Sequence, residues 1–228
     1  RLSQTLDEVI ARRAAHLVDY QDAAYARGYT DLVEGVRRAE KAVVPGSTAL
    51  TEAVARGWHK LLAAKDEYVV ARLYTQTDFL ARIAEQVEGD WKLRFHLAPP
   101  LWARPDPATG EPRKRAYGPW MLRAFRLLAS IRHLRNGFWD PFRFTADRRL
   151  ERRLVAEYRV LIEEILAGLN AGNHATAVEL ASLPEQIRGF GPVRERHVRH
   201  AKQREAELLD AFHRRETPAE VSRSAIHG

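Results

Sequence analysis

Residues 145–169 carry the sequence TADRRLERRLVAEYRVLIEEILAGL, and this stretch decides the fold class of the chain. Its large apolar residues recur at the spacing of one helix face, and charged residues fill most of the remaining positions; the apolar set is Leu150, Leu154, Leu161 and Ile165. Such a period is typical of an amphipathic helix with one face in a core. We therefore predict a long helix from about Thr145 to Leu169.

The same period recurs along most of the chain, so we predict a mainly α fold. Val44-Pro45-Gly46-Ser47 and Asn136-Gly137 are the clearest breaks between helices. The helices predicted in this way cover about 6–20 with Ser3 as N-cap, 29–41, 48–73, 77–87, 119–135, 145–169, a short one after Asn173, and 192–215 after a tight turn at Gly189–Pro192.

One segment has strand character instead. Trp91–Leu97 alternates large apolar and basic residues, and six Pro or Gly residues follow within the next 15 positions. This pattern predicts a half-buried strand and then an extended loop, with Arg113–Tyr117 as the returning strand of a hairpin. Among the histidines, His96 is the one we expect to be buried. The whole is predicted to be a single α-helical domain over 1–216 with one small β hairpin, followed by a frayed tail at 217–228.

Composition excludes several classes of protein. The chain has 228 residues, 45% of them hydrophobic, and no cysteine. It can bury a core, but it cannot hold a disulfide, a cysteine-ligated zinc ion or a cysteine-ligated iron–sulfur cluster. It also lacks an apolar run long enough to cross a membrane. These features favour a cytoplasmic protein.

The positive charge is concentrated in one region. The formal net charge is +7, yet the window from Arg113 to Arg153 alone carries twelve Lys and Arg residues against three acidic ones. Arg123, Arg126, Ser130 and His133 form one polar stripe at helical spacing. Guanidinium groups suit carboxylates and phosphates, so we predict contacts to an acidic partner or a phosphate; the candidates are Arg123, Arg126, Arg148, Arg149 and Arg152. The alternatives are a solvated face with internal ion pairs, or a nucleic-acid site, for which no recognition motif is present.

Other polar residues favour structural roles. Asp66 and Glu67 are adjacent in the predicted 48–73 helix, where neighbouring side chains point about 100° apart, so ion pairing is favoured over paired acid/base work. His197 and His200 have a spacing that can ligate a metal, but no carboxylate completes a set, which favours surface histidines. We identify no catalytic residue and predict no metal site.

Several segments resemble one known family, the bacterial single-chain indolepyruvate ferredoxin oxidoreductases, in their C-terminal region. The resemblance spans roughly residues 5–215. It rests on DYQDAAY at 19–25, AKDEYVVARLYT at 64–75, FHLAPPL at 95–101, GPWM at 118–121, DPF at 140–142 and LPEQIRGFG at 183–191.

The resemblance implies a parent enzyme that decarboxylates an arylpyruvate or related 2-oxoacid oxidatively to an acyl-CoA and reduces ferredoxin. Thiamine diphosphate, Mg²⁺ and 4Fe–4S clusters are implied for that parent, and none of them for this chain, which lacks the cysteines and the diphosphate–metal motif. We therefore expect a non-catalytic module, inactive alone, that packs on the other modules of a homo-oligomeric oxidoreductase and contacts ferredoxin. Neither a membrane nor a nucleic acid is an expected partner.

In this interpretation six aromatic residues are candidate interface anchors: Trp91, Trp102, Trp120, Phe138, Trp139 and Phe142. The alternative is an autonomous helical binding domain for an acidic protein or a phosphate ligand.

Overall fold

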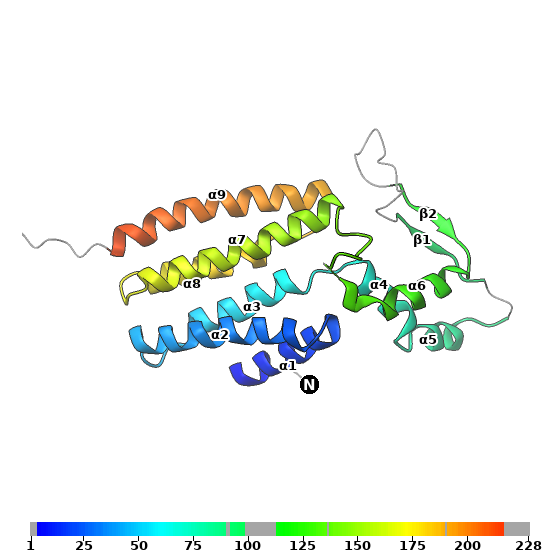
Figure 1. Ribbon diagram of the computed structural model, residues 1–228, viewed down its shortest axis with the longest axis horizontal. Helices are drawn as coiled ribbons and strands as arrows, with labels where there is room; N and C mark the ends of the chain where they lie inside the picture. The colour runs from blue at the N-terminus through cyan, green and yellow to red at the C-terminus, as the bar shows by residue number, and fades with distance from the viewer. Residues whose placement is uncertain (1–3, 90–91, 99–112, 136, 190, 217–228) are drawn as a thin grey trace, which may run out of the picture. The chain divides into compact units, whose positions relative to one another are not determined.

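The computed structural model describes residues 4–89, 92–98, 113–135, 137–189 and 191–216 (Figure 1). Its elements are α1 (Leu6–Tyr20), α2 (Ala23–Val43), α3 (Ala49–Leu62), α4 (Glu67–Thr75), α5 (Phe79–Gln86), β1 (Phe95–Leu97), β2 (Arg115–Tyr117), α6 (Met121–Ser130), η1 (Arg132–Leu134), α7 (Ala146–Gly168), α8 (His174–Ser182), η2 (Leu183–Gln186) and α9 (Gly191–Glu216), where η marks a 3-10 helix. The predicted mainly α fold with one small β hairpin is confirmed. Ser3 and the predicted tail at 217–228 lie outside the described residues.

The prediction of one helix over 48–73 is wrong. Helix α3 ends at Leu62, and α4 starts a new helix at Glu67. Asp66 is the N-cap of α4, with Oδ1 accepting a hydrogen bond from the Val69 amide at 2.8 Å. A carboxylate that satisfies the first free amides of a helix favours a helix start over a continuous helix. Similarly, α2 begins earlier than predicted, because Asp22 accepts a hydrogen bond from the Tyr25 amide at 2.8 Å.

The chain divides into two compact units. The first comprises Arg1–Ile10, Tyr29–Lys60 and Val155–Gly228, and the second comprises Ala11–Gly28 and Leu61–Leu154. The prediction of a single domain over 1–216 stays a prediction.

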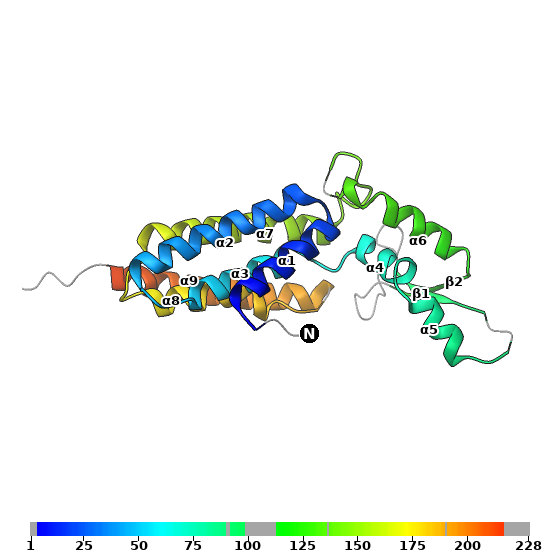
Figure 2. The same cartoon turned by 90° about the horizontal axis from the view of Figure 1, so that it is seen from below.

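In the first unit, α2, α3, α7, α8 and α9 run along a common direction in both views (Figures 1 and 2). The helices bury apolar side chains against one another, among them Val33, Val54, Ile162, Leu180 and Phe212. Leu161 and Ile165 of the predicted α7 stripe are buried as expected.

Gly57 marks the tightest packing in this unit. A Cβ atom there would lie 2.7 Å from the Ala181 carbonyl oxygen and 2.8 Å from the Tyr158 hydroxyl. That hydroxyl in turn donates to the same carbonyl at 2.7 Å. A residue without a side chain is what allows α3 to approach these two groups so closely.

A buried carboxylate organises the other end of α3. Glu40 of α2 accepts hydrogen bonds from the Leu50 and Thr51 amides at 2.9 Å and from the Thr51 hydroxyl at 2.6 Å. His174 Nε2 of α8 lies 2.8 Å from Oε1. Glu40 is therefore a long-range cap that satisfies the free amides of α3 and joins three helices. Burial raises the pKa of Glu40, but the hydrogen bonds outweigh burial and lower this pKa from 4.5 to about 2.

We expect Glu40→Gln to destabilise the chain at pH 7 by about 1–3 kcal/mol, since the α3 amides and His174 lose an ionised acceptor. The folded-state pKa lies below the unfolded one, so the ionised form contributes stability above about pH 4.5 that is lost as pH falls toward about 2. Urea unfolding at several pH values should show a weaker acid loss for Glu40→Gln than for the unaltered chain. The control is Asp31→Asn, an exposed change on α2. Equal acid loss in Glu40→Gln and the unaltered chain would contradict this assignment.

The second unit contains α4, α5, α6 and the hairpin. Strands β1 and β2 pair antiparallel with Phe95 opposite Tyr117 and His96 opposite Ala116. Phe95 is buried with Ala71 of α4 and with Met121, Phe125 and Ala129 of α6. The hairpin prediction is confirmed, but the expectation that His96 is buried is wrong. Strand neighbours point to opposite faces, and Phe95 occupies the inner one, so His96 is exposed.

Gly189 has a φ of 82°, in the left-handed region, as a tight turn before α9 requires. In the described part of the chain, no helix combines the length and the apolar character needed to cross a membrane.

Candidate functional site

The second unit is built around the buried side chain of Asp66. Besides capping α4, this carboxylate accepts hydrogen bonds from Arg135 Nε at 2.6 Å and from Arg148 Nη2 at 2.7 Å. The Tyr20 hydroxyl donates to it at 3.2 Å. All three partners come from segments distant in sequence, so one carboxylate links α1, the turn after η1, α4 and the start of α7.

The electrostatics of this cluster explain why charges persist in the interior. Burial raises the pKa of Asp66, but the hydrogen bond from Arg135 and the charge of Arg148 hold this pKa below its usual range. Burial lowers the pKa of Arg148, but Asp66 and Glu151 more than compensate, so this pKa is raised. Buried charges of this kind are tolerated because each is paired and hydrogen-bonded.

Arg135 is held on all sides. Its guanidinium carbon lies 3.7 Å from the centroid of the Tyr20 ring, a cation–π contact, and Nη1 donates to the Tyr20 carbonyl oxygen. Arg148 also pairs with Glu67 at 3.1 Å and with Glu151 at 3.2 Å. The predicted structural ion pairing of Asp66 and Glu67 is confirmed.

Arg135 and Arg148 bracket a short connector that presents aromatic side chains. Inside it, Asp140 is buried and accepts hydrogen bonds from the Tyr68 hydroxyl at 2.9 Å and from the Phe142 amide at 3.0 Å. The Phe142 ring packs edge-on against Tyr68 with centroids 5.7 Å apart. Asp140 and Phe142 therefore point inward and anchor the connector.

The other aromatic residues of the connector point outward. Phe138, Trp139 and Phe144 are 80%, 76% and 76% exposed, and we call these three residues the aromatic turn. Phe138 and Trp139 lie edge-to-face with ring centroids 5.3 Å apart. Large exposed apolar groups that are close together mark interaction surfaces, because a protein gains nothing by leaving them in water.

Helix α6, which precedes the connector, has an outer face of its own. Its inner face buries Met121, Phe125 and Ala129, so the intervening positions are exposed. There Leu127 is 66% exposed beside the exposed Arg123 and Arg126. Within the described part of the chain neither arginine has an ion-pair partner. Trp120, 59% exposed, precedes this helix.

The predicted arginine contacts thus separate into two groups. Arg123, Arg126 and Arg149 are exposed, and Arg152 is half-buried. Arg148 is buried, and its guanidinium is bound to three carboxylates, so the predicted contact of Arg148 with an outside partner is wrong.

The predicted aromatic anchors separate in the same way. Trp120, Phe138 and Trp139 are exposed, whereas Phe142 is buried and is not available as an anchor. Trp91 and Trp102 lie outside the described residues. Sequence reasoning did not single out Phe144 and Leu127. Both residues lie close in sequence to arginines, which is the one feature that could have marked them. The buried Phe142 and Phe125 share this feature, so only the exposure seen in the structure separates the two pairs.

The two histidines with metal-ligand spacing, His197 and His200, differ in their surroundings. His197 Nδ1 lies 2.8 Å from the Arg188 carbonyl oxygen, and His200 is exposed. Among the described residues there is no group of three or more His, Asp or Glu side chains that could hold a metal ion.

Comparison with known proteins places the chain in a family. Residues 6–207 match the model of a family of unknown function, DUF6537, and the chain belongs to that family. No curated protein and no solved structure matches it.

We expect Asp66→Asn to cost about 3–5 kcal/mol of folding free energy, because it leaves the buried guanidinium of Arg135 without its carboxylate and removes one of the three carboxylates that bind Arg148. Asparagine caps helices as well as aspartate does, so the change removes the charge and keeps the α4 cap. The control is Asp78→Asn, which breaks an exposed pair with Arg82 and should cost less than about 1 kcal/mol. Urea unfolding measures both, and equal stability of the two variants would refute the central role of Asp66.

Proposed function

We propose that this chain is a non-catalytic docking module of a 2-oxoacid:ferredoxin oxidoreductase in the cytoplasm. Its aromatic turn and the arginine-bearing outer face of α6 would bind an acidic protein surface on the catalytic modules or on ferredoxin. The observation that carries the proposal is the exposure of Phe138, Trp139 and Phe144 on a connector whose ends are fixed by buried ion pairs.

The composition of this region is that of a protein interface. Interface cores are enriched in aromatic residues and arginine, and a few aromatic anchors carry most of the binding energy. Around such anchors, exposed arginines speed association with an acidic surface and select for it. Arg123, Arg126 and Arg149 can act in this way because their side chains are exposed.

The resemblance to the oxidoreductase family supports the assignment of the partner. Three of its motifs, at 19–25, 64–75 and 140–142, supply Tyr20, Asp66, Tyr68 and Asp140 to the interior of the second unit. These motifs are far apart in the chain and meet around Arg135, whose guanidinium binds Asp66 and lies over the rings of Tyr20 and Tyr68. The resemblance therefore coincides with the part of the fold that holds the aromatic turn in place.

An autonomous domain that binds an acidic protein or a phosphate ligand is the second candidate function. Arg123 and Arg126, which have no ion-pair partner among the described residues, favour this second candidate equally. The coding sequence upstream of Arg1 separates the two candidates: thiamine-diphosphate and gamma-like modules with cluster cysteines in the same reading frame favour the first, and a stop codon favours the second.

We expect Arg123→Glu with Arg126→Glu to weaken binding to the separately produced catalytic modules or ferredoxin about tenfold at low salt, and less at moderate salt, because exposed charge effects are screened. The matched control is Arg196→Glu with Arg199→Glu, an exposed pair with the same spacing on α9. Calorimetric titration at two salt concentrations gives both values.

Phe138→Ser with Trp139→Ser should reduce the same affinity by about 30-fold or more at either salt concentration, as loss of an aromatic anchor does. Val160→Ser, a change of an exposed apolar residue on α7, is the control. Unchanged affinity in both double variants would refute the docking surface. Tight binding to anionic vesicles or to RNA with no binding to either protein partner would refute it as well.

A further inference from the structure

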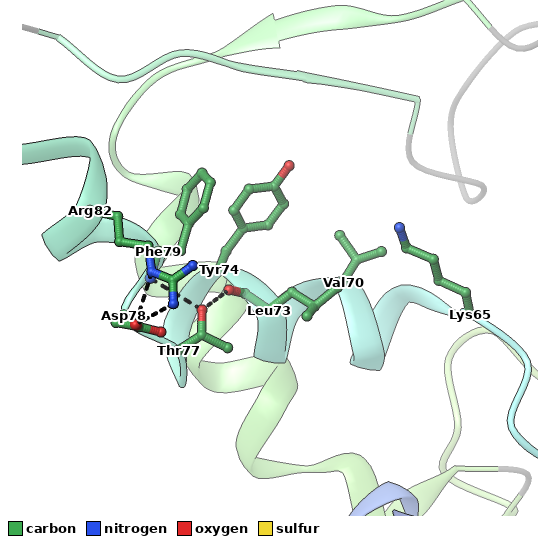
Figure 3. Close-up of a pocket in the computed structure, with 8 residues that line it drawn as sticks. All are labelled: Lys65, Val70, Leu73, Tyr74, Thr77, Asp78, Phe79 and Arg82. Atoms are coloured by element: carbon green, nitrogen blue, oxygen red, sulfur yellow. Dashed lines mark hydrogen bonds and ion pairs between the residues drawn. The ribbon is translucent and has the colours of Figure 1, made fainter. Parts of the chain in front are cut away.

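A pocket of about 490 Å³ lies in the second unit, along α4 and the first turn of α5, and the docking proposal does not use it (Figure 3). Pockets that bind small molecules have volumes of about 300–1,000 Å³ and mostly apolar walls with a few polar groups. Here α4 contributes Val70, Leu73 and Tyr74, and α5 contributes Phe79. The volume of this pocket and the residues that line it are both typical of sites that bind small molecules.

Local sequence explains why this wall is preformed. Val70, Leu73 and Tyr74 share one face of α4 at spacings of three and four. The Tyr74 ring is held by three others: Phe79 and Phe95 edge-on at 5.0 and 5.2 Å, and Phe125 stacked at 5.3 Å. A ring fixed by three neighbours presents a constant surface, so a ligand would bind with little ordering cost.

The charges around the pocket differ in their availability. Arg82 pairs with Asp78 at 2.9 Å, so these two neutralise each other. Lys65, at the other end in Figure 3, is exposed, and among the described residues no carboxylate pairs with it. Val70 and Tyr74 lie between the two ends. As far as the described residues show, the pocket therefore combines an apolar wall with one cation that no carboxylate pairs with.

We propose that this pocket binds an amphiphilic organic anion, with a single carboxylate at Lys65 and an apolar body along Val70, Leu73, Tyr74 and Phe79. A single free ammonium group matches one negative charge, whereas a nucleoside polyphosphate would need several cations. The apolar wall provides the larger part of the contact area, as in most small-molecule sites.

Decanoate and 2-naphthoate are the probes, titrated calorimetrically into the full chain, with decanol as the uncharged comparison. Lys65→Met should weaken carboxylate binding about three- to tenfold, the effect of losing one hydrogen bond at an exposed position, and leave decanol binding unchanged. Lys114→Met, an exposed change of the same kind outside the pocket, should have no effect. If decanoate binds more tightly than 2-naphthoate, the apolar part of the natural ligand is an acyl chain. If 2-naphthoate binds more tightly, it is a flat aryl group.

A second variant tests whether the probe binds against α4. Leu73 is 45% exposed, so Leu73→Glu leaves the core intact and adds a negative charge to the wall, and it should abolish carboxylate binding. Phe138→Ser with Trp139→Ser should leave it unchanged, which separates this pocket from the docking surface. Equal affinity of Lys65→Met and Lys114→Met for decanoate, or absence of saturable binding of either carboxylate, would overturn the proposal.

Discussion

The second unit depends on one buried carboxylate that binds two buried guanidinium groups. Asp66 binds Arg135 and Arg148, which precede and follow the connector with the aromatic turn. Removing charged groups from water is costly, so a cluster like this persists only where every member has its partners. The same contacts that satisfy the charges fix both ends of the connector, and Asp140 fixes its middle through Tyr68. The exposed aromatic side chains are thus held on an anchored segment.

Helix periodicity was sufficient to predict most of the fold. The apolar stripe of α7 and the alternation before the hairpin identified these elements correctly. The break between α3 and α4 was missed, because the apolar period continues through it and a local cap at Asp66 overrides that period. Sequence alone placed Asp66 next to Glu67 on a helix. The partners that give it its role are 69 and 82 residues away, and no local pattern reports them.

The candidate site was only partly predictable, for a related reason. A run of arginines indicates a basic region, but it does not distinguish Arg148, which is bound in the interior, from the exposed Arg149 beside it. In the same way, Phe142 and Phe144 are equivalent by composition, and the hydrogen bonds of Asp140 determine which of them is inside. The pocket at Tyr74 was not predicted, because its wall combines α4 with the start of α5, and the sequence placed α4 inside one long helix.

The first unit is assembled from three separate stretches of the chain, with the second unit's residues inserted between them. On a ribosome, the second unit is fully synthesised once residue 154 has emerged, while α2 and α3 still lack the rest of α7 and all of α8 and α9. Glu40 meets His174 only after 134 further residues have been added. Domains generally fold as units during translation, so the inserted unit can fold first, and the apolar faces of α2 and α3 stay uncovered until the last helices arrive.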